Sequence, residues 1–290
     1  MTLMETNILT PEQEEEIRIL EEDCRRIEPF GHRLFLSNRL NTHPSMNCFF
    51  RAYEGNALAG ILVLFMPDPG QAEVTALVHP ALRRRGVFTA LFAAARRALD
   101  CSGIRTLLFC HEPVCQSGTA VLKKLPVELE HSEFLLEYSR SLAPPSAPEG
   151  LTLQLADQAL IPALAAQAAA AFGDSQAHAR EIAGRFFHHP AVTPYAAWLD
   201  EMLAGHLYRN TEGGETYFCG LCIAPRLQGQ GLGRGMLSLA LECALEETSG
   251  PIRLEVDSGN MAAYRLYRSC GFRETAREDY YLMRGRTDDG

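Results

Sequence analysis

A short glycine-rich segment in the last quarter of the chain places the tightest limit on its fold. Residues 223–237 read Ile-Ala-Pro-Arg-Leu-Gln-Gly-Gln-Gly-Leu-Gly-Arg-Gly-Met-Leu, which indicates a strand end, a glycine turn and the start of a helix. Glycines let the main chain approach a ligand closely, and the N–H groups at a helix N-terminus attract phosphate oxygens. The segment therefore predicts a site for a phosphate-bearing molecule.

Three kinds of phosphate loop compete for this segment, and spacing separates them. A P-loop ends in Gly-Lys-Ser/Thr, whereas Gly233 is followed by arginine. A dinucleotide loop needs Gly-x-Gly-x-x-Gly directly after a strand, but arginine and methionine stand at positions 234 and 236 where the third glycine would fall. Pro225 also ends the strand several residues before the glycines, because proline cannot donate into a β-ladder. The third kind of loop, with the spacing Gln228-x-x-Gly231-x-Gly233, is the one that remains.

A second informative block follows about thirty residues later, at 252–272. Its first residues alternate between apolar and polar, which predicts a buried strand, and Asn260 is suited to cap the N-terminus of a helix. The helical pattern ends at Gly271. Read as a motif, the block is Asn260-x-x-Ala-x-x-Leu-Tyr-x-x-x-Gly-Phe272.

Taken together, the two blocks resemble the GCN5-related N-acetyltransferase (GNAT) superfamily in content, order and spacing. The resemblance implies an enzyme that moves an acetyl group from acetyl-coenzyme A (acetyl-CoA) to a primary amine of a small molecule or peptide, by direct attack in a ternary complex. It implies no metal. The alternative is a catalytically silent acyl-CoA-binding module that senses or regulates.

The resemblance also implies which residues form the site. Tyr267 would be the general acid that protonates the departing sulfur. Contacts to acetyl-CoA would come from the strand end, the glycine loop and the helix cap, namely Cys222, Ile223, Gln228, Gly229, Gln230, Gly231, Leu232, Gly233, Arg234 and Asn260. Glu215 and Asp257 lie at strand ends as candidate bases, but a relay through ordered water is equally open, and no base is assigned.

The length of the chain indicates a second domain. At 290 residues it is about twice a typical domain. Residues 141–150 read Ser-Leu-Ala-Pro-Pro-Ser-Ala-Pro-Glu-Gly, the composition of an extended linker. We therefore expect domains at 1–140 and 151–290. Residues 151–290 show the order β-α-α-β-β-β-α-β-α-β, which fits the GNAT fold.

The first half repeats this order in weaker form, with a period of about 145 residues. Aligning Pro80 with Pro225 sets Arg83 against Gln228, and Lys123 stands where Tyr267 would. The chain thus resembles a tandem GNAT protein whose first domain is degenerate. That domain would bind acetyl-CoA weakly or serve as a scaffold. Its second, weaker site would comprise Val78, Arg83, Arg84, Arg85, Gly86, Val87 and Phe88.

The expected fold class is α/β (α+β by some schemes). It would contain two tandem acyl-CoA N-acyltransferase (GNAT) folds, each a mixed, mostly antiparallel central sheet flanked by helices.

The composition of the chain limits which classes of binding partner are expected. The net charge of −9 argues against non-specific binding to nucleic acid and suits a cationic amine substrate. The sequence contains no apolar run of membrane-spanning length and no signal-peptide pattern, so no membrane partner is expected. The nine cysteines are scattered and odd in number, which favours a reduced, cytoplasmic setting. A monomer or a homodimer is expected.

Overall fold

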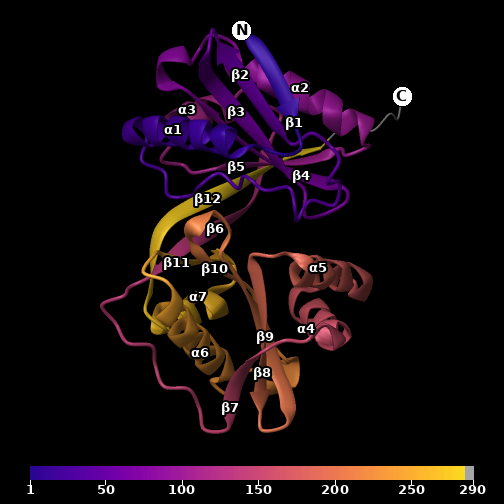
Figure 1. Ribbon diagram of the computed structural model, residues 1–290, viewed down its shortest axis with the longest axis vertical. Coiled ribbons are helices and arrows are strands. Elements are labelled where there is room, and N and C mark those ends of the chain that lie inside the picture. The colour runs from indigo at the N-terminus through magenta and orange to yellow at the C-terminus, as the bar shows by residue number, and fades with distance from the viewer. Residues whose placement is uncertain (285–290) are drawn as a thin grey trace. The chain divides into compact units, whose positions relative to one another are not determined.

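The computed structural model describes residues 1–284, which form two compact units (Figure 1). The first unit contains Met1–Glu133 and the segment that begins at Ala276, and the second is Phe134–Thr275. Strands β6 (Glu128–Tyr138) and β12 (Phe272–Arg284) contribute residues to both units. The compact units divide the chain at residues other than the expected limits of 140 and 151. The expected domains at 1–140 and 151–290 stay a prediction.

The first unit is a sheet with the strand order β1-β2-β3-β4-β5-β12. Neighbouring strands run antiparallel, except that β4 and β5 are parallel. Helices α1 and α2 both pack against β3. The elements are β1 (Thr2–Thr6), α1 (Pro11–Ile27), β2 (Phe49–Glu54), β3 (Ala57–Phe65), β4 (Gln71–Val78), α2 (Val87–Cys101), β5 (Thr106–His111) and α3 (Gln116–Leu122).

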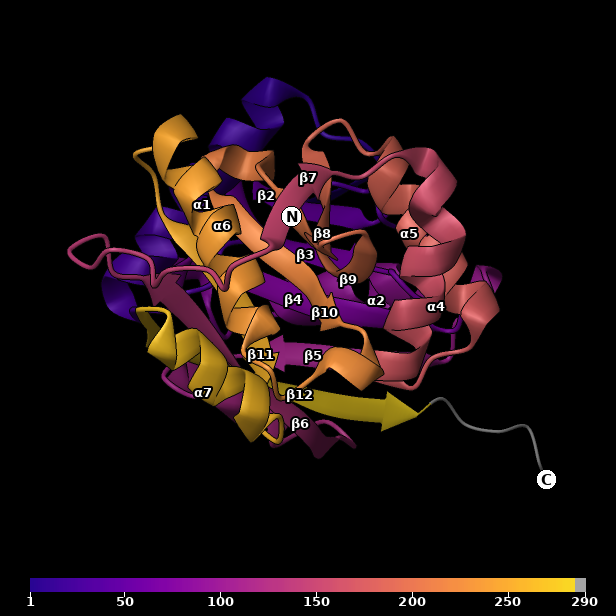
Figure 2. The same cartoon turned by 90° about the horizontal axis from the view of Figure 1, so that it is seen from below.

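The second unit is a sheet with the order β6-β11-β10-β9-β8-β7. Helices α4 and α5 cover one face, and α6, with α7 beside it, covers the other, as both views show (Figures 1 and 2). The elements are β7 (Leu151–Leu155), α4 (Ile161–Phe172), α5 (Gln176–His188), β8 (Val192–Leu199), β9 (Met202–Asn210), β10 (Thr216–Ile223), α6 (Leu232–Glu247), β11 (Ile252–Asp257) and α7 (Met261–Ser269).

This architecture confirms the expected fold class. Each unit has a mixed, mostly antiparallel sheet flanked by helices, and each has one parallel pair, β4 with β5 and β10 with β11. Strand β10 ends at Ile223, where the sequence predicts a strand end before the glycine loop. Strand β1 was not predicted, because it is short and mostly exposed and so lacks a buried alternating pattern.

Local chemistry explains where the helices that position the site begin. The side chain of Thr10 caps α1 in a reciprocal arrangement with Gln13, and Pro11 occupies the first turn. The side chain of Asn260 accepts the Ala263 N–H, which confirms the predicted cap of α7. Gly271, at φ 100°, ends that helix in a backbone conformation that suits glycine.

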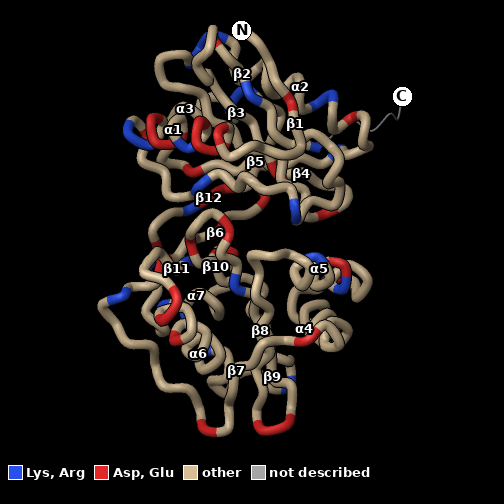
Figure 3. The backbone as a smooth tube through the Cα atoms, viewed as in Figure 1, with Lys and Arg blue, Asp and Glu red and all other residues tan. Residues whose placement is uncertain are grey.

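Each unit has its own hydrophobic core. Phe49, Phe50 and Ile61 are buried in the first, and Met236 and Phe272 are buried in the second. Charged residues run along α1, whereas α4 has none (Figure 3). Among residues 1–284, no helix is long and apolar enough to cross a membrane.

Candidate functional site

The glycine loop forms an open cradle before α6. A 3-10 turn at Pro225–Leu227 ends β10, and α6 begins after Gly231. Gly229 and Gly231 have φ angles of 76° and 80°, which only glycine adopts readily. No atom lies within 4 Å of where a Cβ would stand on either residue, and no side chain caps the helix. The first N–H groups of α6 are therefore accessible to an anion.

Gly233 joins the glycine loop to the second motif. A Cβ at this position would stand 3.0 Å from Leu266 Cδ1 on α7 and 3.5 Å from Ile223 Cγ1 at the end of β10. The missing side chain thus lets α6 pack closely on both elements. The two sequence motifs, thirty residues apart, meet at this glycine.

Strand β10 has a β-bulge just before the loop. Its register with β9 shifts between Cys219 and Cys222, and Gly220 has a φ of 61°. Its parallel register with β11 covers only Thr216 and Tyr217. The main chain beyond the bulge therefore lies outside this parallel register. The sequence interpretation missed the bulge, although a glycine inside a strand pattern is a signal for one.

Tyr267 lies on α7 and is 7% exposed. Burial, with smaller contributions from the nearby thiols of Cys270 and Cys219, raises the pKa of its phenol to about 12. The side chain belongs to the core cluster that also contains Phe218 and Ile223 of β10. Because its pKa is far above neutrality, the phenol keeps its proton and can donate it.

Two polar side chains from the two motifs face the site. Gln228 Nε2 donates to the carbonyl of Ile223 at 3.1 Å, so the loop covers the strand end. Asn260 is exposed, and its Oδ1 accepts the Ala263 N–H at 3.1 Å. Its amide nitrogen has no hydrogen-bond partner within residues 1–284 and can serve a ligand.

The two candidate bases are engaged elsewhere. Glu215 Oε2 pairs with Arg253 Nη1 at 2.8 Å, and Glu215 precedes β10 at the end opposite the glycine loop. Asp257 Oδ1 accepts the Gly259 N–H at 2.7 Å within a local turn. Within residues 1–284, neither carboxylate forms a hydrogen bond with Tyr267.

A buried polar pair behind β10 was missed by sequence reasoning. His206 is 1% exposed, and its Nδ1 lies 3.2 Å from Gln167 Oε1 on α4. Burial lowers the pKa of His206 to about 4, so the ring is neutral and Nδ1 donates to the amide oxygen. Cys222 Sγ also donates to the Gln167 carbonyl, at 3.4 Å. The pair holds α4 to the end of β10. Gln167 and His206 lie 39 positions apart and belong to no sequence motif, so the sequence did not indicate their contact.

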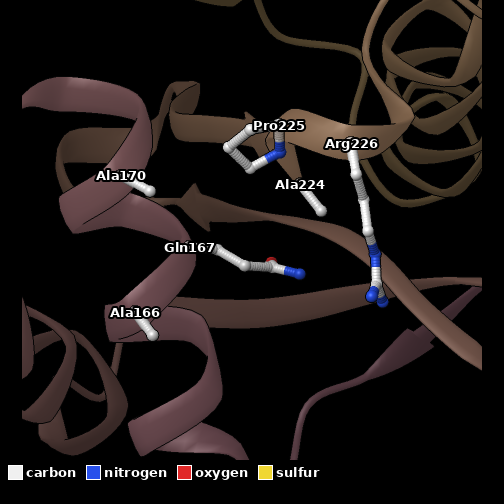
Figure 4. Close-up of a pocket in the computed structure, with 6 residues that line it drawn as sticks. All are labelled: Ala166, Gln167, Ala170, Ala224, Pro225 and Arg226. Atoms are coloured by element: carbon white, nitrogen blue, oxygen red, sulfur yellow. The ribbon is translucent and has the colours of Figure 1, made fainter.

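A pocket lies on the α4 side of the strand end. It has a volume of about 370 Å³ and is lined by Ala166, Gln167, Ala170, Ala224, Pro225 and Arg226 (Figure 4). Its lining joins one helix face to the residues that follow Ile223. A small molecule placed there would lie beside the strand end.

The first unit repeats the backbone of the glycine loop. A 3-10 turn at Pro80–Leu82 follows β4, and Gly86 precedes α2 with a φ of 82°. Arg84 has a φ of 65° at the position of Gly229. Arg83 Nε donates to the carbonyl of Val78 at 3.2 Å, as Gln228 does to that of Ile223. These matches support the predicted alignment of the two halves.

The other residues of the expected weaker site have local partners. Arg85 lies 3.8 Å from Glu54, and both side chains are exposed. Phe88 stacks on Phe92, with ring centroids 5.7 Å apart, and Val87 is buried in the core. These contacts are those of an ordinary helix start.

Comparison with known proteins identifies the relatives of this chain. The model of the acetyltransferase (GNAT) family matches residues 12–118 and again residues 161–272. A mycothiol acetyltransferase from Thermobispora bispora is 29% identical over 287 residues, which cover 91% of this chain and 93% of that protein. The tandem layout expected from the sequence, similar to that of mycothiol synthase, is thereby confirmed.

Solved structures share the fold. A GCN5-related N-acetyltransferase from Sphaerobacter thermophilus superposes with a TM-score of 0.75 at 15% identity, covering 98% of this chain and 96% of its own. A tandem GNAT protein from the clavulanic acid biosynthesis pathway has a TM-score of 0.72 at 19% identity, covering 99% of this chain and all of its own. At these identities the likeness concerns the fold alone.

Proposed function

The chain belongs to the acetyltransferase (GNAT) family, and from this premise we propose that it transfers an acetyl group from acetyl-CoA to a primary amine of a small molecule or peptide, with its working site in the second unit. The observation that carries the proposal is the meeting, at Gly233, of the open glycine loop, the end of β10 and helix α7, which carries the buried phenol of Tyr267.

The glycine loop would hold the pyrophosphate of the donor. The open space at Gly229 and Gly231 and the uncapped N-terminus of α6 fit such a group. The side chain of Asn260 would bind the pantetheine arm, and main-chain groups near Cys222 and Ile223 would orient the acetyl carbonyl. The remaining proposed contacts are Gln228, Gln230, Leu232, Gly233 and Arg234.

Tyr267 would supply the proton that the leaving group needs. A neutral amine attacks the thioester carbonyl, and the departing thiolate is a poorer leaving group until it is protonated. The raised pKa keeps the phenol protonated for this step. Because Glu215 and Asp257 are engaged elsewhere, the proton of the amine would leave through ordered water.

One observation favours a second candidate. Both candidate bases already have partners, Arg253 for Glu215 and the Gly259 N–H for Asp257, which also suits a catalytically silent module that binds acyl-CoA as a sensor. In either case we propose a cytoplasmic protein, monomeric or homodimeric, without a nucleic-acid or membrane partner.

A panel of amines separates the two candidates. The full chain is incubated with acetyl-CoA and each amine, including compounds related to mycothiol because of the named relative, and free thiol is followed. An acetyltransferase releases thiol at a rate that depends on the amine. If coenzyme A binds but no amine releases thiol, the sensor is the correct function.

A further inference from the structure

The pocket beside the strand end offers one charged group to a ligand. Four of its six lining residues are alanine or proline, and α4 carries no charge. The amide of Gln167 is bonded at both atoms, to His206 and to the Leu203 carbonyl. Figure 4 draws Arg226 on the other side of the pocket from α4, and this residue is exposed. Within residues 1–284, Arg226 forms no ion pair.

We propose that this pocket is the acceptor site and that Arg226 binds a carboxylate of the acceptor. The substrate class is then a small amine that also carries a carboxylate, as an amino acid does. The inference rests on the proposed function, because Ala224 and Pro225 follow directly on the main chain that would face the acetyl group. Guanidinium and carboxylate pair through two charge-assisted hydrogen bonds.

The test compares matched amines that differ only in a carboxylate or a carboxamide, such as β-alanine and β-alaninamide. Values of kcat/KM are compared at equal concentrations of the neutral amine, since the two amines differ in pKa. We expect the wild-type chain to favour the carboxylate by about tenfold or more. Arg226→Ala should abolish the preference, and Arg226→Glu should reverse it, while the KM for acetyl-CoA stays unchanged.

Three results would overturn the acceptor assignment. The wild type could show no preference for the carboxylate, the preference could survive in Arg226→Ala, or the Arg226 variants could raise the KM for acetyl-CoA instead. The last result would assign the arginine to the donor. Failure of the proposed function itself looks different, because then no amine releases thiol from any variant.

A second inference concerns the first unit, where residues 28–32, here called the strap, bond to the segments that follow β4 and β5. The parallel register of these strands covers only Gln71–Val74 of β4. Glu112, which follows β5, is 6% exposed and accepts the N–H groups of Gly31 and His32 at 2.7 to 2.9 Å. Arg25 donates to the carbonyls of Phe30 and His32, each at 3.2 Å. The strap is thus held from both sides.

Glu28 is the end of the strap that reaches the repeated loop. Its Oε2 pairs with Arg83 Nη1 at 2.7 Å and accepts the Ser117 hydroxyl at 2.6 Å, while its Oε1 accepts the Ser117 N–H at 2.8 Å. Partial burial opposes ionisation, but the Ser117 bonds and Arg83 outweigh it and hold the pKa of Glu28 below its usual value. The carboxylate is therefore charged and bonded at both oxygens.

These contacts occupy the positions that would receive a cofactor. Arg83 is the counterpart of Gln228 in the proposed pyrophosphate loop, and Ser117 lies in the first turn of α3, the counterpart of α7. The carbonyl of Val78 accepts both Arg83 Nε at 3.2 Å and Cys24 Sγ at 3.5 Å. In the second unit, α4 ends at Gly173, which has no carboxylate to form such a bridge.

We propose that Glu28 latches the cleft of the first unit shut, so that this unit does not bind coenzyme A while the latch is closed. The carboxylate bridges the two segments between which the pantetheine arm would pass. The glycine-loop backbone of the first unit is then intact but covered. This inference concerns the first unit and is independent of the acceptor.

The test counts coenzyme A molecules bound per full chain by titration calorimetry. Glu28→Ala is expected to bind one more molecule than the wild type, with faster amide exchange at residues 116–122. Glu15→Ala serves as the control, because Glu15 is exposed on α1 and should leave both readouts unchanged. If Glu28→Ala does not fold, Glu28→Gln keeps the size of the side chain and carries the same expectation.

Two outcomes would contradict the latch. The wild-type chain could already bind two coenzyme A molecules, or the Glu28 variants could bind the same number as the wild type. The test compares the number of coenzyme A molecules bound by the variant and by the wild type, so it can be read even if the second unit binds none. Absence of binding to the second unit would contradict the proposed function but not the latch.

Discussion

At the scale of single residues, the role proposed for Tyr267 depends on the surroundings of its phenol. A phenol protonates a departing thiolate only if it holds its proton until that moment. Burial against Phe272 and the core raises the pKa of Tyr267 to about 12, so the acid form is present across the neutral range. No loss of rate from this group is therefore expected up to about pH 10.

Replacing this phenol tests its role. Tyr267→Phe keeps the buried ring and removes the proton, so kcat should fall by about 10²-fold with little change in the KM for acetyl-CoA. Tyr264→Phe is the matched control, because Tyr264 lies on the same helix and its hydroxyl bonds only the exposed side chain of Glu274. A Tyr267→Phe variant that turns over like the wild type would refute the assignment.

At the scale of elements, the end of β10 is shaped by its neighbours. A Cβ on Gly205 of β9 would collide with the carbonyl of Cys222 and with Ile223, so only glycine lets the strands lie this close beyond the bulge. The His206–Gln167 pair holds α4 to the same segment. The main chain proposed to face the acetyl group is therefore fixed from two sides.

The glycine loop makes a measurable element-scale prediction. In Gly231→Ala, the left-handed backbone at φ 80° costs about 1–2 kcal/mol, and the new methyl group projects where the pyrophosphate would lie. The KM for acetyl-CoA should rise by about tenfold or more. Gly184→Ala in α5 is the control, because Gly184 has an ordinary φ and open space for a methyl group. This variant should keep the KM for acetyl-CoA unchanged and have equal or higher thermal stability. Equal KM values for the two variants would count against the loop as the donor site.

The two motifs could be predicted from the sequence because each is local. Helix α1, strand β10 and the Asn260 cap follow from periodicity and capping within a few residues. The bulge depends on how β10 pairs with β9, and the strap depends on bonds between residues as far apart as Glu28 and Ser117. Hydrogen bonds across such separations leave no pattern along the chain, so periodicity could not reveal them.

At the scale of the whole molecule, one chain carries two copies of a loop in different states. The second copy has open glycines, whereas in the first Glu28 pairs with Arg83 and Lys123 stands in place of the phenol. The proposed division of labour is a donor site in the second unit and a closed relative of it in the first.

The hydrogen-exchange footprint of acetyl-CoA on the full chain would locate the donor site. Protection is expected at residues 219–235 and 258–267, with no change at 78–90 or 112–122. Protection confined to the first-unit segments would contradict a donor site in the second unit, because acetyl-CoA would then bind to the copy that is proposed to be closed.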